Sequence, residues 1–87
     1  MKIKKGFVIR SVAGVYVVVA TGKLAKKFNG MITLNETGAF LWKCLEEDIT
    51  KEELIEKLLA EYDVEINQAT YDVDSFLKQV VEAKLVE

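Results

Sequence analysis

The first third of the chain carries short runs of β-branched and aromatic residues, and this pattern predicts antiparallel strands. Phe7–Val12 and Val15–Thr21 are two such runs, and Ala13-Gly14 between them has the length of a two-residue hairpin turn. We therefore expect a strand, a tight turn and a second strand over residues 7–21.

A third strand is predicted just before residue 35. Asn29-Gly30 is a turn signal, and it directly precedes the run Met31–Leu34. We expect the strand to end at Leu34 and to extend back as far as Phe28. The sequence leaves open whether Leu24–Phe28 also pairs across the turn.

From residue 35 onward the spacing of apolar residues changes from two to about 3.6, which is typical of helices. Three capping residues mark the expected helix starts: Asn35, Thr50 and Asn67. Thr50 and Glu53 have the spacing of a capping box, in which each side chain bonds the backbone of the other residue. The second part of the chain is therefore predicted to be three helices.

Each predicted helix has an apolar face that we expect to be buried. On the third helix, Asp74, Lys78 and Glu82 are expected to face water. The expected buried positions are Phe40, Leu41, Trp42, Cys44 and Leu45 on the first helix, Leu54, Ile55, Leu58, Leu59 and Tyr62 on the second, and Ala69, Val73, Phe76, Leu77, Val80 and Val81 on the third.

Three strands followed by three helices predict an α+β fold, with a small antiparallel sheet packed against a helical bundle. The chain has 87 residues, too few for two independent cores, so residues 1–87 are expected to form one domain. Its composition, 51% hydrophobic and 30% charged, is that of a folded globular protein.

The residue types that carry most enzyme chemistry are scarce. The chain has no histidine and one cysteine, Cys44, so a metal site is not expected. Cys44 lies between Trp42 and Leu45, where we interpret it as a buried packing residue and not as a nucleophile. No phosphate-binding glycine motif occurs. We therefore predict no catalytic residue and no cofactor.

The sequence also bears on the compartment. A single cysteine cannot form an intrachain disulfide, which favours a reducing compartment, and we expect the cytoplasm. The apolar run Val15–Ala20 has six residues, whereas about 20 are needed to cross a bilayer. We expect no targeting or membrane segment.

Charge is distributed unevenly along the chain. Residues 1–35 carry a net charge of +7 and residues 36–87 a net charge of −9. Three helices with a short sheet also describe winged-helix DNA-binding domains, so a transcription regulator is the alternative function. The second helix carries Glu52, Glu53, Glu56 and Glu61, which would repel phosphates. We therefore expect no nucleic-acid partner.

Residues 29–42 resemble the PqqD family, in which a strand ending in Leu-Asn enters a helix through a Thr-Gly or Thr-Ala step. In this chain the step is Leu34-Asn35-Glu36-Thr37-Gly38. The resemblance continues through the helix after Thr50, through Tyr62-Asp63-Val64, and through Asp72-Val73 with Phe76-Leu77, and so covers nearly the whole chain.

The resemblance implies a winged helix-turn-helix-like domain that binds the leader segment of a ribosomally made peptide. Such a domain presents the peptide to a modifying enzyme, often a radical S-adenosylmethionine protein. A leader strand would extend the sheet and place side chains in a groove between the third strand and third helix. The candidate peptide-binding residues are Phe28, Gly30, Met31, Ile32, Thr33, Leu34, Asp72, Val73, Phe76, Gln79 and Val80.

Two further expectations concern partners. The basic residues Lys23, Lys26 and Lys27 are candidates for attracting acidic residues of the leader. The exposed sheet edge permits a monomer or a weak dimer.

One departure from the family is visible at the end of the chain. The family usually has a glycine between the last helix and a terminal Leu-Leu, and this chain reads Ala83-Lys84-Leu85-Val86 instead.

Overall fold

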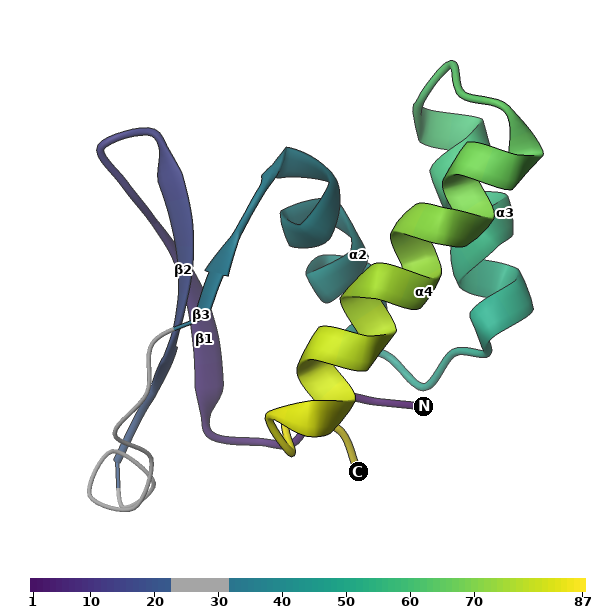
Figure 1. Cartoon of the computed structure of the whole chain (residues 1–87). Coiled ribbons are helices and arrows are strands. Elements are labelled where there is room, and N and C mark those ends of the chain that lie inside the picture. Colours follow the sequence, from purple (N-terminus) through teal and green to yellow (C-terminus); the bar gives the residue numbers. More distant parts are fainter. Residues whose placement is uncertain (23–31) are drawn as a thin grey trace.

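A computed structural model of the chain describes residues 1–22 and 32–87 (Figure 1). The elements follow in the order of three strands and three helices. This confirms the α+β fold class.

The first two strands form the expected hairpin. β1 (Phe7–Val12) pairs antiparallel with β2 (Val15–Ala20), with Val12 opposite Val15 at the turn. Ala13 and Gly14 both have positive φ, 51° and 80°, as a two-residue turn that follows the twist of the strands requires.

The second strand ends one residue earlier than predicted. Thr21 bonds the carbonyl of Gly6 through both its N–H, at 2.7 Å, and its hydroxyl, at 3.0 Å. This side-chain bond, followed by Gly22 at φ 56°, ends the regular pairing at Ala20.

β3 (Ile32–Leu34) pairs antiparallel with β2, so the strand order is β1-β2-β3. The predicted extension of this strand to Phe28, and the open question of pairing by Leu24–Phe28, lie outside the described residues.

Two of the three predicted helix caps are present. α2 (Glu36–Leu45) begins after Asn35, whose Oδ1 accepts from the N–H of Gly38 at 2.7 Å. α3 (Lys51–Glu61) has the predicted capping box between Thr50 and Glu53.

The predicted cap of the last helix is wrong. α4 (Ile66–Glu82) starts at Ile66 with Glu65 as its N-cap, and no side chain caps it. A bond from the N–H of Val64 to the carbonyl of Tyr62 turns the chain there, and Glu65 follows in extended conformation. The helix therefore begins before Asn67, which lies within its first turn.

The core lies between the sheet and the helices, which all lie on one side of the sheet, with α3 farthest from it (Figure 1). Each fully buried side chain there contributes about 1.5–3 kcal/mol by leaving water. The fully buried side chains with the largest volumes are those of Val18, Leu41, Trp42, Leu45, Leu54, Leu58, Val73, Val80 and Leu85.

Of the sixteen positions expected to be buried, nine are buried. Six are half-buried beside the core and one, Val81, is exposed; the half-buried six are Phe40, Cys44, Ile55, Leu59, Tyr62 and Leu77. Val81 is 51% exposed, because it lies about 100° around the helix from the buried Val80. Cys44 is half-buried at the margin of the core, where it packs beside the fully buried Trp42 and Leu45.

The two ends of the chain lie side by side (Figure 1). Ile3 forms an isolated antiparallel bridge with Val86, and the N–H of Lys4 donates to the carbonyl of Leu85 at 2.8 Å. Ile3 and Leu85 are both buried, so the paired ends of the chain form part of the core.

Candidate functional site

β3 is the edge strand of the sheet. Within residues 1–22 and 32–87, no strand pairs with its second side. An edge strand directs unpaired backbone N–H and C=O groups outward, and another extended chain can bond to them.

The hairpin turn determines which backbone groups of β2 face β3. A two-residue loop joins a pair of residues that exchange both hydrogen bonds, so Val12 and Val15 form such a pair. The bonding direction alternates along a strand. The backbone groups of Val17 therefore point to β1, and those of Tyr16 and Val18 point to β3.

The same alternation leaves one residue of β3 facing away from β2. Ile32 and Leu34 lie opposite Val18 and Tyr16 and bond to them. Thr33 therefore directs its N–H and C=O to the open edge. A long hydrogen bond agrees with this direction, since Nε2 of Gln79 donates to the Thr33 carbonyl oxygen at 3.5 Å.

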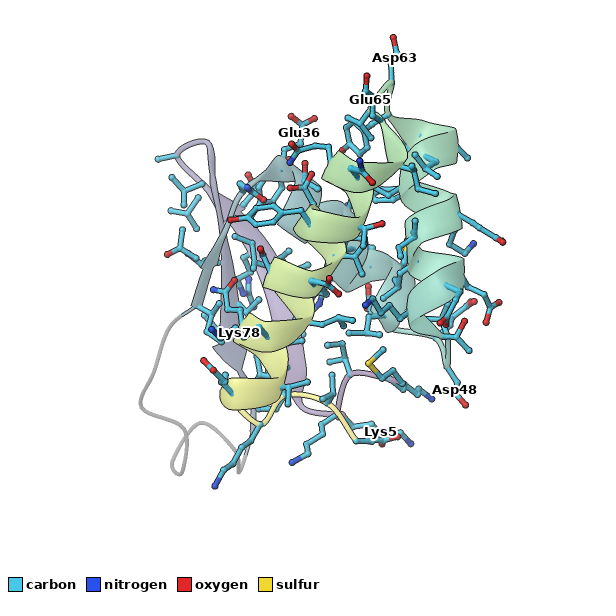
Figure 2. All side chains as sticks on the ribbon, turned by 45° about the vertical axis from the view of Figure 1, so that its right-hand side comes forward. Lys5, Glu36, Asp48, Asp63, Glu65 and Lys78 are labelled. Carbon is cyan, nitrogen blue, oxygen red and sulfur yellow. The ribbon has the colours of Figure 1, made fainter. Side chains whose placement is uncertain are left out.

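A groove of about 360 Å³ lies between this edge and α4. Leu34 and Phe76, each 4% exposed, supply its apolar surface. In Figure 2, α4 runs beside the sheet, with Glu36 near the end where α4 begins and Lys78 farther along the helix. The lining residues are Thr33, Leu34, Asn35, Thr37, Gly38, Tyr71, Asp72, Ser75, Phe76 and Gln79.

Gly38 keeps α2 close to β3 at the wall of this groove. A Cβ at this position would lie 3.1 Å from Oδ1 of Asn35 and 3.4 Å from Cβ of Leu34. Because Asn35 Oδ1 is held by its bond to the Gly38 N–H, it has little freedom to move away. The step from β3 to α2 therefore leaves little room for a side chain at residue 38.

A second hollow, of about 570 Å³, adjoins the first. It shares Thr33, Leu34 and Asn35 with the groove and reaches the hairpin at Gly14 and Tyr16. The surface open to a ligand therefore continues past the end of β3 toward the β1–β2 turn.

The structure brings five of the predicted peptide-binding residues to one place. They are Thr33, Leu34, Asp72, Phe76 and Gln79. Ile32 is half-buried in β3 and does not line the groove. Val73 and Val80 are fully buried and support the groove from the core side of α4. Phe28, Gly30, Met31, Lys23, Lys26 and Lys27 lie outside the described residues.

Sequence reasoning missed half of the lining. Asn35 was interpreted as a helix cap, and Thr37 and Gly38 only as part of the family resemblance, although the start of α2 also places all three beside the edge strand. Tyr71 and Ser75 were overlooked because they are exposed and lie outside the predicted apolar face of the helix. They lie four residues apart, and Gln79 lies four beyond, which is the spacing of one helical face.

The titratable groups near the core do not form a reactive centre. Burial raises the pKa of the Cys44 thiol, and the nearby Lys57 opposes this only in part. The pKa of Tyr62 is also raised, first by burial and then by the negative charge of Glu36 and Glu61. Both groups are therefore protonated at neutral pH.

Two features of the described residues concern metal binding and membranes. Among the described residues, no group of three or more histidine, cysteine, aspartate or glutamate side chains is placed to hold a metal ion. Of the helices that the structure describes, none is long and apolar enough to cross a membrane.

Comparison with known proteins identifies similar chains. A family model described as "Coenzyme PQQ synthesis protein D (PqqD)" matches residues 15–86. A solved structure described as "TbiB1 in Complex with the TbiA(beta) Leader Peptide" has a TM-score of 0.76 and 25% sequence identity, and the match covers 100% of this chain and 95% of that one. No curated protein matches significantly.

Proposed function

The chain belongs to the PqqD family, and from this premise we propose that it binds the leader segment of a ribosomally made precursor peptide. The solved TbiB1 structure, which is similar over the whole chain, holds a leader peptide. The observation that carries the proposal is the outward-facing backbone of Thr33 at the open edge of β3, directly beside the groove.

In this proposal the leader adds to β3 as a further strand. Its backbone bonds the N–H and C=O of Thr33, and the long bond from Gln79 to that carbonyl gives way to the peptide. Alternate side chains of a strand point to opposite faces, so every second leader residue enters the groove against Phe76. Ordering a flexible leader costs free energy, so we expect affinity near micromolar, about −8 kcal/mol.

We further propose that the protein is a non-catalytic adaptor that acts without a cofactor. Its role is to present the peptide to a separate modifying enzyme in the cytoplasm, for which a radical S-adenosylmethionine enzyme is the family precedent. The protonated thiol of Cys44 and the composition of the groove, which combines hydroxyls, amides and one carboxylate, fit a binding surface better than a reaction centre.

DNA binding is the less favoured function. Glu52, Glu53, Glu56 and Glu61 are all exposed on α3, so a phosphate backbone approaching this helix meets negative charge. If DNA were the partner, affinity for a duplex would fall steeply with salt, and we expect no duplex binding even at low salt.

Proline at Thr33 tests the proposed strand addition. Thr33→Pro removes the one outward N–H of β3 without removing a bond to β2, so the fold should persist while binding falls at least about tenfold. Thr33→Val is the matched control, since it keeps the N–H and should keep the affinity. The measurement is isothermal titration with the leader segments of short peptides encoded beside radical enzymes in the source genome.

A second variant checks the direction of the backbone. Ile32→Pro removes a bond within the sheet, so it should lower the melting temperature, whereas Thr33→Pro should leave it close to that of the original protein. If Thr33→Pro binds leaders as tightly as Thr33→Val, the strand-addition mechanism is wrong.

A further inference from the structure

The groove contains a single charged side chain, and it is negative. Asp72 is half-buried, and its Oδ1 accepts a hydrogen bond from Nε2 of Gln68 at 2.9 Å. This bond orients the carboxylate and leaves Oδ2 as an acceptor. No lysine or arginine among residues 1–22 and 32–87 forms an ion pair with it.

The other carboxylate on this stretch of α4 is satisfied within the fold. Asp74 bonds Nζ of Lys51 on α3 at 2.6 Å, on the side of α4 that packs against α3. Asp72 and Asp74 have the same charge and lie two positions apart in the sequence. Only Asp72 turns its carboxylate into the groove.

An exposed aromatic ring borders the same end of the groove. Tyr71 is 67% exposed, the largest exposed fraction among the large hydrophobic side chains of the described residues. An aromatic face beside a carboxylate offers a cation both a charged acceptor and a π surface. The flanking Thr37 and Ser75 add hydroxyl acceptors.

Three further carboxylates lie toward the end of the molecule where α4 begins. In Figure 2, Glu36, Glu65 and Asp63 all lie near the end of the molecule where α4 begins, and Lys78 and Lys5 lie toward the other end. Negative charges near the groove raise the local concentration of cations and favour a positively charged group beside Asp72.

We propose that this end of the groove takes a lysine or arginine side chain of the bound strand, held by the Asp72 carboxylate and the ring of Tyr71. The inference rests on the proposed function, since the cation is carried by the peptide that adds to β3. It assigns a class of side chain to one position of the peptide: a residue that points to the groove and carries a positive charge.

The test begins with an mRNA-displayed library of short random peptides, selected on the full chain. Peptides that bind the original protein but not Thr33→Pro are kept for analysis, because they use the edge of β3. We expect these binders to share a lysine or arginine at one fixed position, and selection on Asp72→Asn to lose that preference.

Single peptides from the selection then measure the pairing by fluorescence anisotropy. Norleucine in place of the shared lysine, or arginine converted to citrulline, should weaken binding to the original protein about five- to tenfold and binding to Asp72→Asn less than about twofold. Tyr71→Leu should weaken binding about two- to fivefold. Asp74→Asn is the matched control and should leave the affinity unchanged.

The outcomes separate this inference from the function on which it rests. Binders that depend on Thr33 but show no basic position, or that tolerate the neutral replacement, overturn the assignment of Asp72 and leave leader binding intact. A selection on the folded chain that yields no Thr33-dependent binder contradicts strand addition itself.

Discussion

Lys84 occupies a backbone position that favours glycine. Its φ is 61°, in the left-handed region, and it follows the C-cap Ala83 of α4. The N–H of Leu85 bonds the carbonyl of Val80 at 2.9 Å, and that of Lys84 bonds Val81 at 3.0 Å, which together define a Schellman motif. Within Ala83–Val86, Lys84 is therefore the position whose backbone favours glycine.

Glycine at position 84 should stabilise the fold. Lys84→Gly relieves the left-handed strain and should raise the free energy of unfolding by about 0.5–1 kcal/mol. Urea denaturation followed by circular dichroism measures the change. Ala83→Gly is the control, because Ala83 has helical φ and gains nothing from glycine, so it should be neutral or destabilising. A loss of stability in Lys84→Gly would contradict the motif.

The thiol of Cys44 should react slowly in the folded protein. Burial raises its pKa above the usual value, so at pH 8 less thiolate is present than in the unfolded chain. We expect slower modification by a thiol reagent in buffer than in urea. Because the folded-state pKa is the higher one, this thiol contributes stability below the unfolded pKa, and the contribution is lost as pH rises through the folded value.

At the scale of elements, the strands and helices were predictable because their signals are local. The Ala13-Gly14 turn, the cap at Asn35 and the box at Thr50 each depend on residues within four positions of one another. The start of α4 was not predictable in this way. Its N-cap, Glu65, makes no side-chain bond, so the helix begins where the preceding turn and the burial of Ala69 place it.

The two asparagines provide a direct comparison of a real cap with a predicted one. Asn35→Ala removes the acceptor for the Gly38 N–H and should cost about 1 kcal/mol, a fall in melting temperature of about 4–8 °C. Asn67→Ala should change stability by less than about 0.5 kcal/mol, because Asn67 caps nothing. If thermal melts show equal falls in melting temperature for the two variants, Asn67 stabilises its helix as much as Asn35 does, which contradicts this assignment of the caps.

The groove was predictable as a place but not as a list of residues. The family resemblance implied a groove between the third strand and the third helix, and Asp72, Phe76 and Gln79 were among the residues expected there. Which side of α4 faces β3 depends on how Val73 and Val80 pack in the core. That packing is set by contacts distant in sequence, and short motifs do not contain it.

Across the molecule as a whole, the two ends of the chain pair with each other and cover one end of the core. The helices lie on one side of the sheet, and the pairing of Ile3 with Val86 joins the N-terminal segment to the residues after α4 (Figure 1). Leu85 lies at this junction with no exposed surface. The orientation of α4, and with it the width of the groove, therefore depends on residues remote from the groove.

Replacing Leu85 with alanine tests whether the paired ends of the chain stabilise the fold. Leu85→Ala should cost about 2–5 kcal/mol through lost burial and the cavity that remains, which lowers the melting temperature by at least about 10 °C. Val81→Ala, on the neighbouring exposed surface, should cost less than about 0.5 kcal/mol. Calorimetry of the two variants decides the matter, and a small effect at Leu85 would show that the paired ends do not stabilise the fold.

The described residues of β3 offer few backbone groups for recognition. Of its three residues only Thr33 faces outward, so the described edge offers an incoming chain one donor and one acceptor. Two such bonds supply about 1–3 kcal/mol, far below the roughly 8 kcal/mol of a micromolar complex. Along this described part of the edge, side chains must therefore supply more of the binding energy than the backbone does, which makes it a reader of particular sequences and a poor receptor for extended chains in general.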